Sequence, residues 1–174
     1  AVLDACAERL RAEGVAQIVY KALPSIYART PAQEDLYWLF RRDAALFRRD
    51  VSVAIDYRAR GRISSRRRRG AQRAAKGGVA LGRSQDWTGF WRLLELVLAD
   101  RHGARPVHSL TEIELLAARH PDEIALFTAE SGGELVAGVV MFRSRHVAHA
   151  QYIAVGEAGR QINALDGLFE YLID

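Results

Sequence analysis

The residues best suited to chemistry lie between positions 147 and 170, where the chain reads VAHAQYIAVGEAGRQINALDGLFE. A run of β-forming residues carries His149 and Gln151, and a glycine-containing loop then leads into a helix with an apolar face. The first turn of a helix presents backbone N–H groups that have no intrahelical partner, and the macrodipole adds positive potential there. This order of strand, loop and helix predicts a site for a phosphorylated carrier.

Within this segment, the loop 156–163 could hold a pyrophosphate through its backbone N–H groups, and Arg160 would add positive charge. Alternatively, the loop is a plain connection whose glycines serve only the turn. His149 and Gln151 are predicted to share one face of the strand, because side chains two residues apart point the same way. His149 is either a general base near neutral pH or a half-buried histidine satisfied by a hydrogen bond. Tyr152 is predicted to lie on the opposite face, in the core.

The positive charge of the chain is concentrated in one segment. The chain has 25 Lys and Arg against 21 Asp and Glu, yet ten basic residues and no acidic one lie between Arg58 and Arg83. Four of these cations recur at helical spacing and can share one stripe: Arg66, Arg69, Arg73 and Lys76. The stripe would contact the phosphates of a nucleic acid or another polyanion, or it is simply a solvated helix face. No aromatic residues are interleaved with it for base stacking.

The elements that must position these residues alternate between helices and strands. Helices are predicted over residues 1–14, 30–49, 64–76, 86–103 and 109–120 and from 164 onward, and strands over 15–23, 51–57, 79–82, 124–129, 134–143 and 147–155. Thr30, Pro31 and Gln33 would start the second helix as cap, first helical residue and capping-box partner. The order predicts an α+β fold with a mixed, mainly antiparallel sheet flanked by helices.

Size and composition set further bounds. A chain of 174 residues with 49% hydrophobic and 26% charged residues suits one globular domain or two half-domains. No apolar run reaches about 18 residues, so no membrane span is expected. Cys6 is the only cysteine; it is predicted to be packing or surface filler, and it favours a reducing, cytoplasmic location. Ala1 has no helix cap and Asp174 no stop signal, which is typical of a piece of a longer polypeptide.

Three stretches of the chain resemble the GNAT acyltransferase superfamily, and within it the FemAB-like, peptidoglycan-bridge-forming proteins with two GNAT-like halves. Residues 66–79, RRRRGAQRAAKGGV, are similar to their basic linker helix, and residues 86–142 to the first helices and strands of the second half. Residues 149–173, HAQYIAVGEAGRQINALDGLFEYLI, resemble the strand, pyrophosphate loop and helix that hold the acyl carrier. The loop departs from the usual family motif, because its second glycine is absent.

The resemblance implies a domain organisation. Residues 1–63 would form a partial first GNAT-like half, residues 64–78 the basic linker helix, and residues 79–174 a second half that is truncated at its C-terminus. The resemblance also implies an α/β-type GNAT fold.

The same resemblance implies an N-acyltransferase that needs no metal. An acyl or aminoacyl group would pass from acetyl-CoA, another acyl-CoA or an aminoacyl-tRNA to an amine on a small molecule or peptide. The amine would attack in a ternary complex, and a backbone N–H beside the splayed strands would polarise the carbonyl. The residues implied are Gly159, Arg160, Gln161, Asn163 and Ala164 at the carrier, His149 and Gln151 at the acyl-transfer centre, and Tyr27, Arg29 and His108 at the acceptor. His108 would otherwise only shape its turn.

If the donor is an aminoacyl-tRNA, the helix carrying Arg66 to Lys76 would be its natural contact. Two other classes of function remain open at this point. The chain could be a non-catalytic module with a degenerate GNAT core that binds nucleic acid or a partner through the basic helix. It could also be a regulatory domain that senses a CoA metabolite without turnover.

Overall fold

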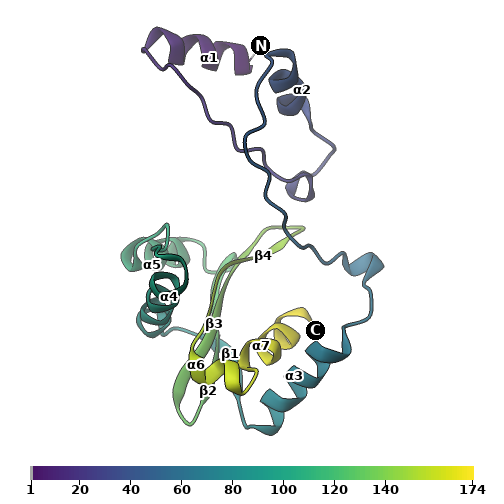
Figure 1. Cartoon of the computed structure of the whole chain (residues 1–174), viewed down its shortest axis with the longest axis vertical. Helices are drawn as coiled ribbons and strands as arrows, with labels where there is room; N and C mark the ends of the chain where they lie inside the picture. The colour runs from purple at the N-terminus through teal and green to yellow at the C-terminus, as the bar shows by residue number, and fades with distance from the viewer. Residues whose placement is uncertain (1) are drawn as a thin grey trace. The chain divides into compact units, whose positions relative to one another are not determined.

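The computed structural model describes residues 2–174, which divide along the chain into two units, with the boundary between Arg58 and Ala59 (Figure 1). Each unit is considered by itself. Along residues 2–174, no helix combines the length and the apolar character that crossing a bilayer requires.

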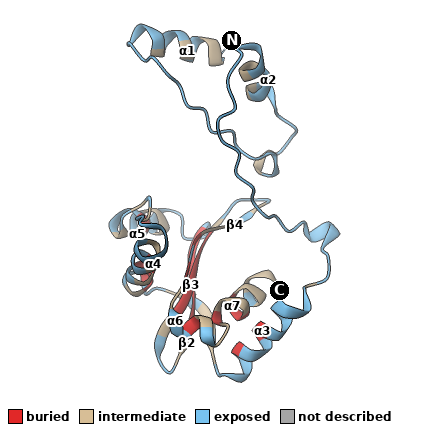
Figure 2. Cartoon of the chain, viewed as in Figure 1, coloured by how far each residue is buried: buried red, intermediate tan, exposed pale blue. Residues whose placement is uncertain are grey.

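The first unit contains two short α-helices, α1 (Val2–Ala12) and α2 (Glu34–Arg41), and the 3₁₀ turn η1 (Ser25–Tyr27); a second turn, η2 (Tyr57–Ala59), spans the boundary. None of residues 2–58 is buried (Figure 2). The strands predicted over 15–23 and 51–57 are wrong, since residues 2–58 contain no strand. A strand needs a ladder partner and an apolar face to cover; here Val51 and Val53 are 92% and 93% exposed. The predicted partial GNAT-like half is therefore not confirmed by these residues.

The second helix also begins later than its sequence predicts. It starts at Glu34 with Gln33 as its cap residue, and the Gln33 side chain makes no capping hydrogen bond. The Thr30 start was therefore wrong. The Asp35 carboxylate instead accepts hydrogen bonds from the Leu36 N–H (2.8 Å) and from the Tyr20 hydroxyl (2.7 Å).

The second unit is built on a sheet whose four strands follow chain order: β1 (Ala80–Ser84), β2 (Ile124–Ser131), β3 (Glu134–Arg143) and β4 (Ala148–Val155). Every neighbouring pair is antiparallel, which confirms the predicted α+β class and its antiparallel hairpins. The β2–β3 turn uses Gly132 and Gly133, whose φ angles of 60° and 82° favour glycine.

Helices cover both faces of this sheet (Figure 1). On one face lie α4 (Trp87–His102) and α5 (Leu110–Arg119), and their aromatic and aliphatic residues, such as Phe90, Trp91 and Ile113, fill a buried cluster with Val140. On the other face lies α7 (Ala164–Ile173), preceded by the short helix α6 (Glu157–Gln161). This arrangement leaves the end of β4 beside the start of α7.

The basic segment forms α3 (Ser65–Lys76), as its sequence predicts, and α3 packs against α7. The Ser64 hydroxyl accepts from the Arg67 N–H at 3.4 Å and caps the helix. The buried residues of α3 are all small: Gly70, Ala71 and Ala74. This helix, expected as a linker, is thus part of the layered fold of the second unit.

The glycine at position 138 yields the first prediction. A Cβ atom there would lie 2.4 Å from Cδ2 of the fully buried Phe90, so Gly138→Ala overpacks the core and should lower the free energy of unfolding by about 1–3 kcal/mol. Gly82→Ala is the matched control, because a Cβ at Gly82 meets nothing within 4 Å; it should stabilise by up to about 1 kcal/mol. Urea unfolding followed by tryptophan fluorescence in a Trp38→Phe background reports the second unit alone. Equal effects of the two substitutions would contradict this packing.

Candidate functional site

The strand β4 contains a bulge next to the predicted acyl-transfer residues. Val140 pairs with Tyr152 and Met141 pairs with Ala150, so Gln151 is an extra residue with no opposite number on β3. A bulge leaves a residue outside the ladder and redirects its neighbours, and bulges are common beside active sites.

The bulge interrupts the alternation from which a shared face for His149 and Gln151 was predicted. Ala150 packs in the cluster on the α7 side of the sheet, whereas Tyr152 packs on the α4 side. His149 is exposed and pairs with Phe142, while Gln151 is half-buried. Both residues lie at the outer edge of the sheet, because β4 is the last strand.

The predicted carrier loop begins as an extension of the β-ladder. The Gly156 N–H donates to the Val136 carbonyl at 3.0 Å, and residues 157–161 then form the short helix α6, which the sequence did not predict. Gly159 is buried against β3, where a Cβ atom would lie 2.4 Å from the Val136 oxygen. This glycine is needed for close packing, whatever else it does.

Arg160 braces the same loop. Its Nη1 donates to Glu157 Oε2 at 3.0 Å, and its Nη2 donates to the Val155 carbonyl at 3.1 Å. The Arg160 Nε is buried and has no hydrogen-bond partner within residues 2–174. The guanidinium thus links the loop to the end of β4 and brings positive charge there.

The start of α7 differs from the other long helices of residues 59–174. Side chains cap α3, α4 and α5, but no side-chain hydrogen bond caps α7. Asn163 adopts the left-handed conformation (φ 59°, ψ 32°), and its carbonyl accepts from the Asp166 and Gly167 amides at 3.0 and 3.3 Å. The amides of Ala164 and Leu165 come first at this N-terminus; Ala164 is fully buried, whereas Leu165 is half-buried.

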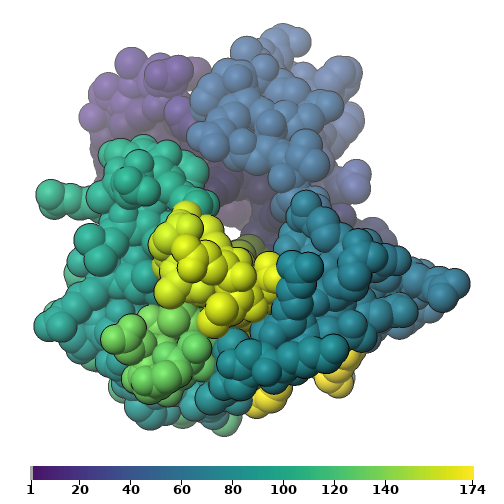
Figure 3. Space-filling view, turned by 60° about the horizontal axis from the view of Figure 1, so that its bottom comes forward, coloured from purple at the N-terminus to yellow at the C-terminus, as the bar shows by residue number. Residues whose placement is uncertain are grey.

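Two glycines and one ion pair hold α3 close to α7, and sequence reasoning missed them. A Cβ on Gly70 would lie 2.1 Å from Asp166 Oδ2, and one on Gly167 would lie 2.9 Å from the Ala74 Cβ. Asp166, only 15% exposed, pairs with Arg67. Figure 3 shows the two helices side by side at the surface. Glycine in the middle of each helix was the one sequence signal for this approach.

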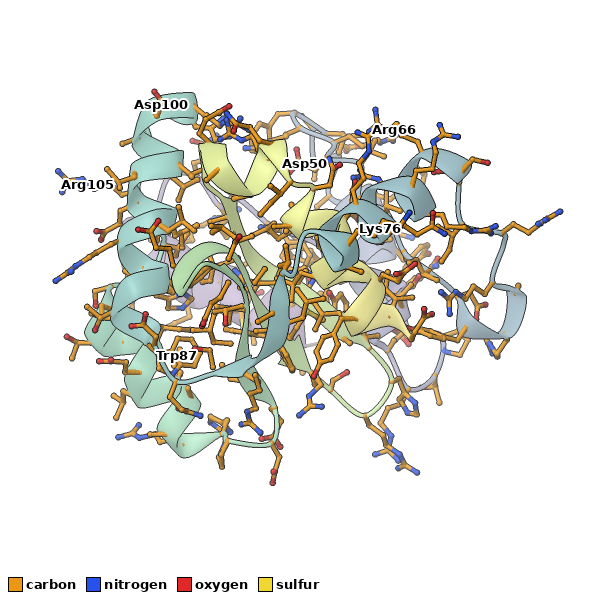
Figure 4. The ribbon with its side chains drawn as sticks, turned by 90° about the horizontal axis from the view of Figure 1, so that it is seen from below. Asp50, Arg66, Lys76, Trp87, Asp100 and Arg105 are labelled. Carbon is orange, nitrogen blue, oxygen red and sulfur yellow. The ribbon has the colours of Figure 1, made fainter. Side chains whose placement is uncertain are left out.

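The predicted basic stripe lies on the outer face of α3. Its residues are all exposed, and none forms an ion pair with a residue that the structure describes: Arg66, Arg69, Arg73 and Lys76. Arg66 and Lys76 both extend from α3 in Figure 4.

Tyr152 is buried, as predicted, but the predicted face is wrong: Tyr152 packs on the α4 side, as does Phe142, the strand partner of His149. The Tyr152 hydroxyl contacts His108. The Tyr152 Oη lies 2.5 Å from His108 Nδ1 and accepts from the His108 N–H at 3.3 Å. The Tyr152 ring also packs edge-on against Trp91, with centroids 5.1 Å apart. His108 is half-buried and shapes the turn before α5, and the same contact places its ring next to the bulged strand.

Tyr27 and Arg29 belong to the first unit, whereas His108 belongs to the second. Tyr27 ends η1 and is half-buried, and Arg29 follows it on the surface. The grouping of these three residues at one acceptor site stays a prediction.

A model of the acetyltransferase (GNAT) domain family matches residues 57–174, about two thirds of the chain. The chain belongs to the GNAT acetyltransferase family. A search of curated proteins found no match. The matched region takes in α3, the whole sheet and α7, so the second unit is the GNAT domain. Membership confirms the predicted superfamily and, in general terms, acyl transfer.

The capping box of α5 yields a pH prediction. Glu112 Oε2 accepts from the Ser109 N–H (2.7 Å) and hydroxyl (2.8 Å), and these hydrogen bonds lower the pKa of Glu112 below its usual 4.5. A depressed pKa in the folded state contributes stability above pH 4.5, and this contribution is lost as the pH falls through the folded pKa. Thermal melts between pH 3 and pH 7 should show Glu112→Gln less stable than wild type near pH 7, and the gap should narrow as the pH falls below 4.5.

Glu114→Gln removes the same charge from α5 outside the capping box and is the control. A gap between wild type and Glu112→Gln that stays constant over this pH range would contradict the charged capping box.

Proposed function

We propose that this GNAT domain is an N-acyltransferase that transfers an acyl group from acyl-CoA to an amine. The observation that carries the proposal is the order of features along residues 151–164. The bulge at Gln151 comes first, the loop at Gly156 follows, and the chain then reaches the start of α7, which no side chain caps. This segment lies inside the region matched by the GNAT family.

In this proposal the carrier pyrophosphate lies at the start of α7. The amide of Leu165 would donate to its oxygens, and Asn163 and Gln161 would flank it, while the fully buried Ala164 would act through packing. Arg160 would contribute charge while it holds the loop in place. Gly159 would act through packing, since its Cβ position is filled by β3.

The chemistry would take place beside the bulge. The amine nitrogen, once neutral, attacks the thioester carbonyl; the C–S bond of the tetrahedral intermediate then breaks, and CoA leaves as the thiolate, which takes up the proton released by the amine. A backbone N–H freed from the ladder at Gln151 would stabilise the oxyanion. His149, exposed on the same strand, would accept the amine proton, and Gln151 would orient the acceptor.

The finer parts of the proposal concern the type of enzyme and its substrates. The type proposed is FemAB-like and cytoplasmic, with a small-molecule or peptide amine held by His108 in the second unit. An aminoacyl-tRNA is the alternative donor. The exposed basic face of α3 favours a second candidate function, a non-catalytic module that binds nucleic acid. An assay for free CoA thiol released from acetyl-CoA in the presence of amines distinguishes the two candidates, because only an enzyme would release it.

Thermal unfolding with acetyl-CoA, longer acyl-CoAs and free CoA tests the carrier site directly. A ligand at about 100 times its Kd adds about 2.7 kcal/mol, which raises Tm by several degrees. No shift with any of these compounds would contradict an acyl-CoA site and favour the tRNA donor or the non-catalytic module.

Asn163→Asp sharpens this test. Aspartate also tolerates the left-handed conformation and suits a helix N-terminus, so the fold should be retained. Its carboxylate would repel the pyrophosphate by about 1 kcal/mol, which raises the Kd for CoA about fivefold or more. Thr111→Asp adds the same charge to the first turn of α5 and should leave the Kd unchanged. Equal Kd values for both variants, measured by calorimetry, would contradict the proposed position of the carrier.

A further inference from the structure

The outer side of α3 carries four cations on one exposed surface, which we call the basic face: Arg66, Arg69, Arg73 and Lys76. The first and the last are ten positions apart, so at 1.5 Å per residue the face extends about 15 Å along the helix. None of these cations has an acidic partner within residues 2–174.

The basic face disfavours the helix that carries it. Four consecutive arginines occupy positions 66–69 at the start of α3, and its first turn contains no acidic residue. Cations near a helix N-terminus oppose the macrodipole, and like charges three or four residues apart repel each other. A face that served only solubility would mix both signs. A local conflict of this kind, without compensation inside the fold, is typical of a functional surface.

Arg67, which is next to the basic face in sequence, does have an acidic partner. Arg67 pairs with Asp166 of α7, so the chain supplies a carboxylate where α3 meets the fold and none on the outer side. The close approach at Gly70 and Gly167 fixes α3 on α7. The basic face therefore lies on a helix that is packed against α7.

The composition of the face indicates its partner. Arginine guanidinium groups match phosphate oxygens in a bidentate geometry. The apolar residues of α3 are all alanines, of which Ala71 and Ala74 are buried, so no apolar side chain is available for insertion into a bilayer. With no aromatic residue on α3, bases cannot be stacked. We propose that the basic face binds the phosphate backbone of a nucleic acid duplex without reading its sequence. This inference does not depend on acyl transfer.

The test compares two variants of the full chain that lose equal charge. The first replaces Arg66, Arg69, Arg73 and Lys76 by Gln. The control replaces four exposed arginines on or next to α4 and α5 by Gln: Arg92, Arg101, Arg105 and Arg119. Binding to a fluorescein-labelled 20-base-pair duplex of arbitrary sequence, as RNA and as DNA, is measured by anisotropy between 50 and 200 mM KCl.

Each phosphate contact adds about 0.9 to the slope of log K against log salt concentration, so the first variant should lower that slope by about 3 to 4. The control should lower it by less than about 1. Because repulsion within α3 is relieved, the first variant should melt at the same temperature as wild type or slightly higher. Equal slopes for the two variants, or no binding by wild type at 50 mM KCl, would overturn the proposal.

Two further probes separate other partners. Polyglutamate of equal charge that competes as well as the duplex would overturn the proposal in favour of an acidic protein. Vesicles with 30% phosphatidylserine that bind wild type when the duplex does not would overturn it in favour of a membrane surface. A lower melting temperature for the first variant would show that the face is structural. None of these outcomes bears on CoA binding, which is measured separately.

Discussion

The close packing of α3 on α7 is the constraint on which the rest of the GNAT domain depends. Two helix axes can approach this closely only where small residues meet, and Gly70, Ala74 and Gly167 provide that contact. The approach positions α7 over the sheet, beside the end of β4. Both proposed surfaces, the start of α7 and the basic face of α3, follow from this one contact.

An ion pair between α3 and α7 accompanies the same contact. Asp166 lies in the first turn of α7, where a carboxylate suits the helix dipole, and Arg67 neutralises it from α3. An anionic ligand at Leu165 would therefore meet a paired carboxylate and not a free one. The Arg160 guanidinium adds a positive group where the loop meets the strand.

The elements that sequence alone predicted well are those specified by local signals. The helices predicted to start at residues 64, 86 and 109 do start there, with Ser64, Asp86 and Ser109 as their caps, and the Gly132–Gly133 turn joins β2 to β3. Such signals act within a few residues, so they can be read without knowledge of the fold.

The features that sequence did not predict depend on distant partners. Residues 15–23 and 51–57 have strand composition but no ladder partner in residues 2–58. The bulge at Gln151 arises from the register with β3, and the packing role of Gly159 arises from the Val136 carbonyl. Neither could be read from the loop sequence. The segment predicted to hold the site lies inside the region matched by the GNAT family, and the roles of its residues stay predictions.

The most direct measurement is an amide NMR titration of the full chain with acetyl-CoA. A carrier bound at the start of α7 should shift the amides of Ala164 and Leu165 most, with the shifts continuing to Gln151 at the bulge. The side-chain-capped start of α5, at Leu110 and Thr111, should stay unchanged. Saturable binding that leaves Ala164 and Leu165 unshifted would contradict the proposed carrier site.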